Sequence, residues 1–212
     1  MPELPEVETI RRQLETDLLG RSVAAIETRW PKSLTGRGLD PAALLGRPVT
    51  RIWRRGKVLG IDAEGGVSVL VHLRMTGQLL MESVESDSQV SMGDSPTRVI
   101  LHLGDAARLV FNDQRKFGRI VVLPSTDVAD DPLIARMGPE PLEAGFDAEV
   151  LGAILSRRPG LRLKAALLDQ SVVAGIGNIY ADEVLWCAQA SIPNGGAERC
   201  GAPKSGPCTR AS

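Results

Sequence analysis

The chain has 212 residues, of which 43% are hydrophobic and 3% aromatic, and its formal net charge at pH 7 is −1. This composition predicts a globular protein with an aliphatic core, and it excludes nucleic-acid binding driven by global basicity, so any such site must be a local cluster. No apolar run approaches the roughly 20 residues of a membrane span, and acids stand where a signal peptide would be basic and apolar, so we expect a cytoplasmic protein with no membrane partner.

The first predicted element is an amphipathic helix. In the stretch VETIRRQLETDLLG, residues 7–20, apolar side chains recur at spacings of three and four, and a glycine follows as a stop. Pro5 suits the first position of a helix, where its missing N–H costs nothing, and the acids after it suit the positive end of the helix dipole. These preferences leave Pro2 and Glu3 unexplained.

Short apolar runs divided by glycine-containing turns follow the helix. Such runs are typical of strands, and the polar stretch 82–96 predicts a long loop. We therefore expect an α+β chain whose N-terminal helix is followed by an antiparallel sandwich or barrel. The predicted strands lie within residues 22–30, 48–62, 67–75, 98–103, 108–113 and 118–123.

The hydrophobic period changes near residue 131. Helical patterns occupy residues 131–138, 146–158 and 157–190, the last interrupted at 175–178. The sequence after them is rich in Gly, Pro and Ser and should be disordered. The predicted organisation is an N-terminal domain over 1–126, a partial helical domain over 127–188 and a divergent tail over 189–212.

The N-terminal residues can carry carbonyl chemistry. If Met1 is removed, Pro2 exposes a secondary α-amine, a class of group that titrates near roughly 8 and can attack an aldehyde carbon. Glu3 beside it can move protons. The alternative from these two residues alone is that Pro2 is a processing signal and Glu3 a solvated charge.

Three further candidates lie in the predicted strands. Lys57 follows the basic stretch RRG. It could bind a phosphate or act in acid–base chemistry. The alternative is that it belongs to a solvated basic hairpin without such a role. His72 and Met75 end an apolar strand. A lone histidine or methionine there is either structural, as part of the core, or part of a site.

Two loops have the composition of a nucleic-acid contact. Arg115 and Phe117 lie in RKFG just after a predicted strand. In such a loop, cations can hold phosphates and an aromatic ring can enter a base stack. The alternative is a charged turn that one aromatic ring anchors. Asn178 follows two glycines at a helix start, which is suited to phosphate, although a short glycine-rich turn is a weak signal. Arg158 and Lys164 lie upstream and would extend a phosphate track.

Six separated stretches resemble the formamidopyrimidine-DNA glycosylase family in the same order. They are PELPEVE, RRGK, HLRMTG, FNDQRKFG, MGPEPL and KAALLDQSVVAGIGNIYADEVL, and the resemblance covers about residues 1–185. It implies an N-terminal helix and antiparallel β-sandwich followed by an incomplete helix–two-turn–helix domain. The PELPEVE form is more similar to the enzyme for oxidised purines than to its endonuclease VIII relatives.

The resemblance also implies a role for each candidate. Pro2 would be the nucleophile at the sugar C1′ carbon, Glu3 the proton donor in base release, and Lys57 an aid to strand elimination. The gap left by a flipped nucleotide would be filled by Met75, Arg115 and Phe117. The other expected DNA contacts are His72, Arg158, Lys164 and Asn178.

The implied activity is that of a glycosylase and abasic-site lyase for oxidised purines such as 8-oxoguanine and formamidopyrimidines. The implied partner is damaged double-stranded DNA, bound by a monomer associated with a bacterial nucleoid. Two alternatives stay open: an endonuclease VIII-like enzyme for oxidised pyrimidines, and a catalytically dead DNA-binding remnant. A tautomerase with an N-terminal proline is disfavoured, because those chains are much shorter and lack RKFG and GIGN.

The family's zinc finger has no counterpart in the sequence. Full-length relatives hold a structural zinc with paired C-x-x-C ligands, whereas Cys187, Cys200 and Cys208 form no such pair. We therefore expect no metal and no other cofactor.

The resemblance fades at about Trp186, as expected for a truncated or frameshifted reading frame. The helix over about 179–188 would then lack its usual neighbours. We expect Val184, Leu185 and Trp186 to have no packing partners.

Overall fold

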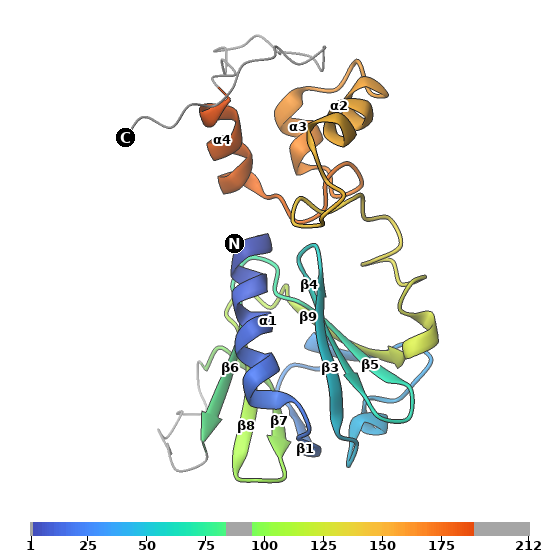
Figure 1. The fold of residues 1–212 in the computed structure, drawn as a ribbon. Helices are drawn as coiled ribbons and strands as arrows, with labels where there is room; N and C mark the ends of the chain where they lie inside the picture. Colours follow the sequence, from blue (N-terminus) through green and yellow to red (C-terminus); the bar gives the residue numbers. More distant parts are fainter. Residues whose placement is uncertain (1, 84–94, 189–212) are drawn as a thin grey trace. The chain divides into compact units, whose positions relative to one another are not determined.

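A computed structural model describes residues 2–83 and 95–188 of the chain. These residues form two compact units, divided between Ala135 and Arg136 (Figure 1). The first unit combines one long helix with two β-sheets, and the second is helical. The predicted α+β class, with a sandwich after an N-terminal helix, is confirmed.

Helix α1, Leu4–Leu18, begins the first unit. It starts one residue before the expected position, so Pro5 is its second residue rather than its first. Its buried side chains, Leu4, Val7, Leu14 and Leu18, recur at helical spacing and belong to the core face. The predicted stop at Gly20 is confirmed by a backbone φ of +77°, a conformation that glycine adopts without a steric cost.

One sheet of the sandwich has four strands, in the order β1-β7-β8-β6, and all of its neighbouring strands are antiparallel. Strand β6 was not predicted, and it includes residues 82 and 83, which were expected to start a loop. Residues 84–94 of that expected loop lie outside the described residues. The strands are β1 (Val23–Thr28), β6 (Gly77–Ser83), β7 (Thr97–Leu103) and β8 (Ala107–Asp113).

The other sheet has five strands, in the order β2-β9-β5-β4-β3. The unpredicted strand β2 pairs with β9 in parallel, while the other pairs are antiparallel. Apolar side chains of both sheets and of α1 form one continuous core, so the sheets face each other across it. The strands are β2 (Leu34–Gly36), β3 (Val49–Arg55), β4 (Val58–Ala63), β5 (Val67–His72) and β9 (Arg119–Pro124).

Three short 3-10 helices connect these strands and follow the last of them: η1 (Pro31–Ser33), η2 (Pro41–Leu44) and η3 (Ser125–Asp127). The helix expected over residues 131–138 is wrong, since this stretch forms only turns. The main-chain carbonyl of Asp131 accepts the N–H groups of Ile134 and Ala135, both at 2.8 Å, but Gly138 and Pro139 lie a few residues further on and disfavour continuation of a helix.

The second unit contains α2 (Ala148–Ser156), α3 (Leu163–Leu168) and α4 (Asn178–Cys187). The expectation that Leu185 lacks a partner is wrong, because it is buried in a cluster with Leu167 of α3. Val184 and Trp186 are exposed, with 44% and 80% of their surface accessible. The tail over 189–212 lies outside the described residues, so its predicted disorder stays a prediction.

Candidate functional site

The N-terminal end of α1 holds a buried acid. Glu3 caps the helix and is only 1% exposed. Its main-chain N–H donates to the Glu6 carboxylate at 2.9 Å, and its own carboxylate accepts from the Glu6 main chain, which completes a reciprocal capping box. Pro2, half-buried, precedes this fixed backbone. The capping box therefore fixes the backbone from which Pro2 extends.

Lys57 lies in the tight turn between β3 and β4. Arg55 pairs with Val58, so Gly56 and Lys57 form a two-residue hairpin turn with Gly56 at a φ of +54°. Lys57 is 8% exposed. Burial lowers the pKa of its ammonium group, and the negative charge of Glu3 opposes that shift. The two side chains thus interact electrostatically at the same end of the unit.

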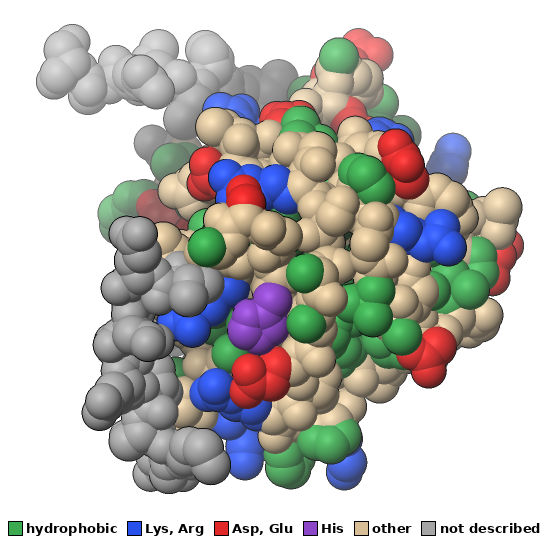
Figure 2. Space-filling view, turned by 90° about the horizontal axis from the view of Figure 1, so that it is seen from below, with side chains coloured by type: hydrophobic (Ala, Val, Ile, Leu, Met, Phe, Trp, Pro, Cys, Tyr) green, Lys and Arg blue, Asp and Glu red, His purple; other side chains and the backbone are tan. Residues whose placement is uncertain are grey.

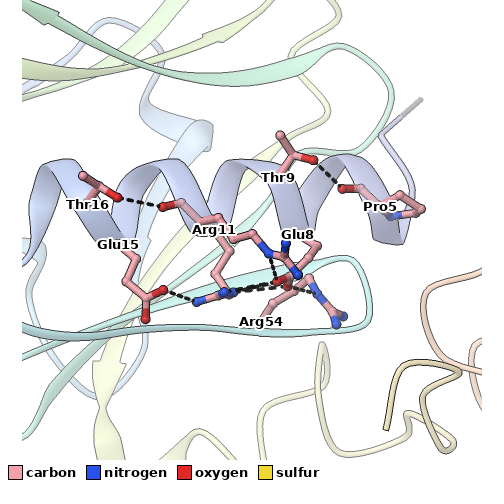
Figure 3. Close-up of polar contacts among 8 residues, drawn as sticks. Pro5, Glu8, Thr9, Arg11, Glu15, Thr16 and Arg54 are labelled. Atoms are coloured by element: carbon pink, nitrogen blue, oxygen red, sulfur yellow. Dashed lines mark hydrogen bonds and ion pairs between the residues drawn. The ribbon is translucent and has the colours of Figure 1, made fainter.

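An ion pair ties the Lys57 hairpin to α1 (Figure 3). Arg54 donates from Nε to the Glu8 carboxylate at 3.1 Å and from Nη1 to the Gly56 carbonyl at 2.9 Å. Burial raises the pKa of Glu8, but hydrogen bonds from Arg11, Arg12 and Arg54 outweigh it, and the pKa falls from 4.5 to about 2. Glu8 is therefore an anion at neutral pH, and it holds the hairpin against the helix that carries Pro2 and Glu3.

His72 ends β5 beside the same hairpin, where it pairs with Val58. Its Nδ1 accepts the main-chain N–H of Arg74 at 3.1 Å. Burial, with the positive charges of Arg74 and Lys57, lowers the pKa of His72 from 6.5 to about 4. The imidazole is therefore neutral at pH 7 and can accept or donate a hydrogen bond there without carrying charge.

This pKa predicts a loss of stability in mild acid. Between pH 6.5 and 4 the unfolded chain binds a proton on His72 that the folded chain does not, so stability falls as pH falls through this window. From pH 7 to pH 5 we expect a loss of about 2 kcal/mol in unfolding free energy from this residue. Urea unfolding at the two pH values would measure it in the native chain and in His72→Gln, which keeps an acceptor for Arg74. An equal loss in both chains would contradict the assignment.

Two neighbouring loops present exposed apolar side chains beside cations. Met75, between β5 and β6, is 44% exposed, and Phe117, between β8 and β9, is 47% exposed. The Arg115 guanidinium lies 4.9 Å from the centre of the Phe117 ring, and the Lys116 ammonium lies 4.3 Å from the centre of the Trp30 ring. Neither Met75 nor Phe117 is a core residue, so the interpretation of Met75 as core is wrong.

The second unit presents a helix N-terminus framed by polar side chains. Gln170 accepts the Gly175 N–H and donates to the Ile176 carbonyl, both at 2.9 Å, and so fixes the loop that leads into α4. Asn178 opens α4 and is exposed. N–H groups at a helix start are ready donors for an anion.

The cationic candidates of this unit pair with acids. The Lys164 ammonium lies 2.6 Å from one carboxylate oxygen of Asp182, and the Asn178 amide donates to the other at 3.5 Å. Arg158 lies 3.4 Å from the Asp169 carboxylate. Asp182 therefore links Lys164 to Asn178, while Arg158 has a separate acidic partner.

Lys57 thus interacts electrostatically with Glu3 and with His72, and Pro2 directly precedes Glu3, which links the four residues at one end of the first unit. The sequence does not predict the bond between Glu8 and Arg54 that supports them, because these two residues lie 46 positions apart. Asp113, a buried acid between the exposed loops, was also missed. A signal existed for it, since an aspartate directly after an apolar strand often caps the turn that follows.

Among residues 2–83 and 95–188, no three or more His, Cys, Asp and Glu side chains are grouped so as to hold a metal ion. Cys200 and Cys208 lie outside these ranges. No helix in the described part of the chain is long and apolar enough to cross a membrane. Acidic and basic side chains are interspersed on the face seen in Figure 2, so this face carries mixed charge.

Two family models match the chain. The Formamidopyrimidine-DNA glycosylase N-terminal domain matches residues 1–120, and the Formamidopyrimidine-DNA glycosylase H2TH domain matches residues 137–199. The formamidopyrimidine-DNA glycosylase of Desulfitobacterium hafniense is 44% identical over 190 residues, and that of Herpetosiphon aurantiacus is 42% identical over 192 residues. Each match covers 89% of this chain and 67% of the relative, so the chain spans about two thirds of the relatives' length.

Solved structures of Lactococcus lactis Fpg are similar to this fold. The wild-type enzyme in complex with DNA containing N7-benzyl-Fapy-dG has a TM-score of 0.77 and 33% identity, covering 89% of this chain and 68% of that one. A complex with DNA containing an abasic site has a TM-score of 0.75 and 31% identity, covering 88% of this chain and 67% of that one. The same enzyme has also been solved with DNA containing an oxidised pyrimidine, at a TM-score of 0.77 and 32% identity.

Proposed function

Because the chain belongs to the formamidopyrimidine-DNA glycosylase family, we propose that it is a base-excision-repair glycosylase that removes oxidised purines from DNA and then cleaves the abasic site. The observation that carries this proposal is the Glu3–Lys57 pair. The buried Glu3 carboxylate and the buried Lys57 ammonium interact electrostatically, and Pro2 directly precedes Glu3 in the chain. Together, Pro2, Glu3 and Lys57 can supply a nucleophile, a proton donor and a second amine to one reacting sugar.

The proposed reaction begins at the sugar C1′ carbon of a flipped nucleotide. The Pro2 nitrogen forms a bond to C1′ while the bond from C1′ to the damaged base breaks, and the base leaves with a proton supplied by Glu3. The C1′–O4′ bond then breaks while the proton lost from the Pro2 nitrogen is transferred to O4′, which leaves an iminium between Pro2 and C1′. Loss of a C2′ proton expels the 3′ phosphate, and loss of a C4′ proton expels the 5′ phosphate. Water then hydrolyses the iminium and frees Pro2.

The surroundings support distinct roles for the neighbouring side chains. The lowered pKa of Lys57 makes its neutral, proton-accepting form more accessible than in an ordinary lysine, so we assign Lys57 to the elimination steps. His72, neutral at pH 7, is assigned to a hydrogen bond with the DNA backbone. Pro2 supplies the reacting amine, so the proposed chemistry needs no cofactor, and one chain acting as a monomer carries all the assigned groups.

We assign the binding of damaged DNA to residues of both units. Met75, Arg115 and Phe117 would fill the space vacated by the flipped nucleotide, since their loops expose apolar surface and a cation together. Lys164 and Asn178 would bind phosphates beside the α4 N-terminus. Arg158, which pairs with Asp169, would bind a further phosphate.

The pairing with Asp182 predicts a gain in DNA affinity when that acid is neutralised. Asp182→Asn keeps the shape of the side chain but removes the negative charge that holds Lys164 and faces any incoming phosphate. We expect DNA affinity to rise about fivefold at low salt, with a smaller gain at 0.5 M salt. Fluorescence anisotropy at both salt concentrations would measure the change. Asp169→Asn removes the acidic partner of Arg158 and should raise the affinity in the same way. Unchanged affinity in Asp182→Asn would remove Lys164 from the contact.

A preference for oxidised pyrimidines is the second candidate, favoured by the complex of the similar Lactococcus lactis Fpg with DNA containing an oxidised pyrimidine. The test offers the full chain duplexes containing 8-oxoguanine, thymine glycol or a preformed abasic site, each with borohydride present. Faster adduct formation with 8-oxoguanine supports the proposal, and faster adduct formation with thymine glycol supports the second candidate. A folded chain that forms no trapped adduct with any of the three would be a DNA-binding remnant.

A further inference from the structure

Asp113 is a carboxylate with 0% exposure that the proposed chemistry does not use. It ends β8, at the start of the loop that carries Arg115 and Phe117. One oxygen accepts the Gly118 N–H at 2.6 Å, and the other accepts the Arg115 N–H at 3.2 Å. Asp113 therefore binds main-chain N–H groups near the start and at the end of the loop that follows it.

The same carboxylate also reaches a second loop. It accepts the hydroxyl proton of Thr76, which follows Met75 between β5 and β6. The Thr76 hydroxyl oxygen in turn accepts the Arg115 N–H at 3.2 Å. Thr76 thus bonds to Asp113 and to Arg115 at once, although 37 sequence positions separate it from Asp113.

The sheet topology explains why these loops meet. One loop runs from β5 in the five-stranded sheet to β6 in the four-stranded sheet, and the other runs from β8 back to β9. Strand β6 pairs with β8, with Gly77 opposite Asp113, and β5 pairs with β9, with His72 opposite Arg119. Both loops therefore cross between the sheets side by side, with the Thr76–Asp113 bond between them.

Both loops also hold backbone conformations that need support. Arg74 and Lys116 have φ values of +56° and +60°, which are uncommon for residues with a side chain. A Cβ on Gly118 would lie 2.5 Å from the Phe111 ring, and a Cβ on Gly77 would clash with the main chain of Leu73. The surrounding contacts thus define one geometry for each loop.

From these contacts we propose that Thr76 and Asp113 are positioning residues that make the Met75 loop and the Arg115–Phe117 loop act as one rigid unit on damaged DNA. The use of this unit on DNA rests on the proposed function, whereas the link between the loops is a property of the free protein. The experiment therefore has one part without DNA and one with it.

The first part measures amide hydrogen exchange in the full chain. Thr76→Val removes the hydroxyl at nearly constant volume, and Thr76→Ser keeps it. We expect the Arg115 amide, on the other loop, to exchange about tenfold faster in Thr76→Val, as for the loss of one hydrogen bond, and to be protected again in Thr76→Ser. Amides of β5 and β9 should not change. Unchanged exchange at Arg115, or an equal rise throughout both strands, overturns the proposal.

The second part measures how strongly the loops depend on each other when they hold DNA. The readout is the preference for a duplex with a reduced abasic site over an intact duplex, for Met75→Ala, Phe117→Ala and the double variant. Each substitution should reduce this preference by some factor. In the native background and in the Thr76→Ser background, the factor for the double variant should be about fivefold smaller than the product of the two single factors. With Thr76→Val the losses should simply multiply, and equal coupling in all backgrounds overturns the proposal. If the native chain shows no preference for the abasic duplex, the proposed function fails. The hydrogen-exchange result then still shows whether Thr76 and Asp113 join the two loops.

Discussion

Replacing Pro2 by glycine is expected to slow strongly the formation of the borohydride-trapped adduct with abasic DNA. Glycine still allows removal of Met1, but it replaces a secondary amine in a fixed ring with a primary amine on a freely rotating backbone. The attacking amine is then no longer held in one orientation at C1′, and we expect trapping to slow on the order of a hundredfold or more. The measurement is the rate of adduct formation by the full chain under single-turnover conditions.

A matched control lies three residues along the chain. Pro5→Ala changes a proline of the same helix end, at the second position of α1, without touching the N-terminal amine. It should trap DNA at close to the native rate, because alanine is a good helix former. A Pro2→Gly chain that traps as fast as Pro5→Ala would show that the reaction does not need the proline ring, and it would contradict the role assigned to Pro2.

The second large effect is expected from Glu3→Gln, and it should separate the two halves of the reaction. Glutamine keeps an acceptor for the capping box at the start of α1 but cannot donate the proton that the leaving base needs. Release of 8-oxoguanine should slow by about 10²- to 10⁴-fold. Trapping on a preformed abasic site, where no base leaves, should stay within about tenfold of the native rate.

The same variant should change the pH dependence of strand cleavage. The charge of Glu3 raises the pKa of Lys57, so its removal lowers that pKa further. The limb of the pH–rate profile that reports Lys57 should therefore move to lower pH in Glu3→Gln. Glu6→Gln, the exposed partner in the capping box, is the control and should leave that limb in place. A parallel loss of base release and trapping would indicate a structural role for Glu3 instead.

Local pattern was sufficient to predict most of the first unit. Helix α1 and most of its strands follow from side chains whose spacing matches the helix or strand repeat. Strand β6 was missed because an exposed Leu80 lies between the inward-facing Leu79 and Met81, so the run does not alternate in polarity. The apolar spacing predicts a helix over 131–138, where the structure has turns, because spacing within eight residues does not reveal whether a helix can continue past Gly138.

The candidate site likewise has a part that the sequence predicts and a part that it does not. Pro2, Glu3 and Lys57 were predicted as residues, but their support depends on bonds between distant positions, such as Glu8 with Arg54. No period or short motif encodes which acid meets which arginine. Leu185 illustrates the same limit: its sequence neighbours Val184 and Trp186 are exposed, yet it is buried because α3 supplies Leu167 as a partner.

The small apolar clusters of the second unit have a thermodynamic consequence. One is built on Val172 and Val173 and the other on Leu167 and Leu185, whereas the first unit shares one core among two sheets and a helix. Less buried apolar surface means that α4 opens to solvent at a lower free energy than β5 does. A ligand that requires closed α4 binds only the closed fraction of molecules, so its observed dissociation constant is the intrinsic one divided by that fraction. Substitutions that enlarge these clusters would therefore tighten binding without adding a single contact to the ligand.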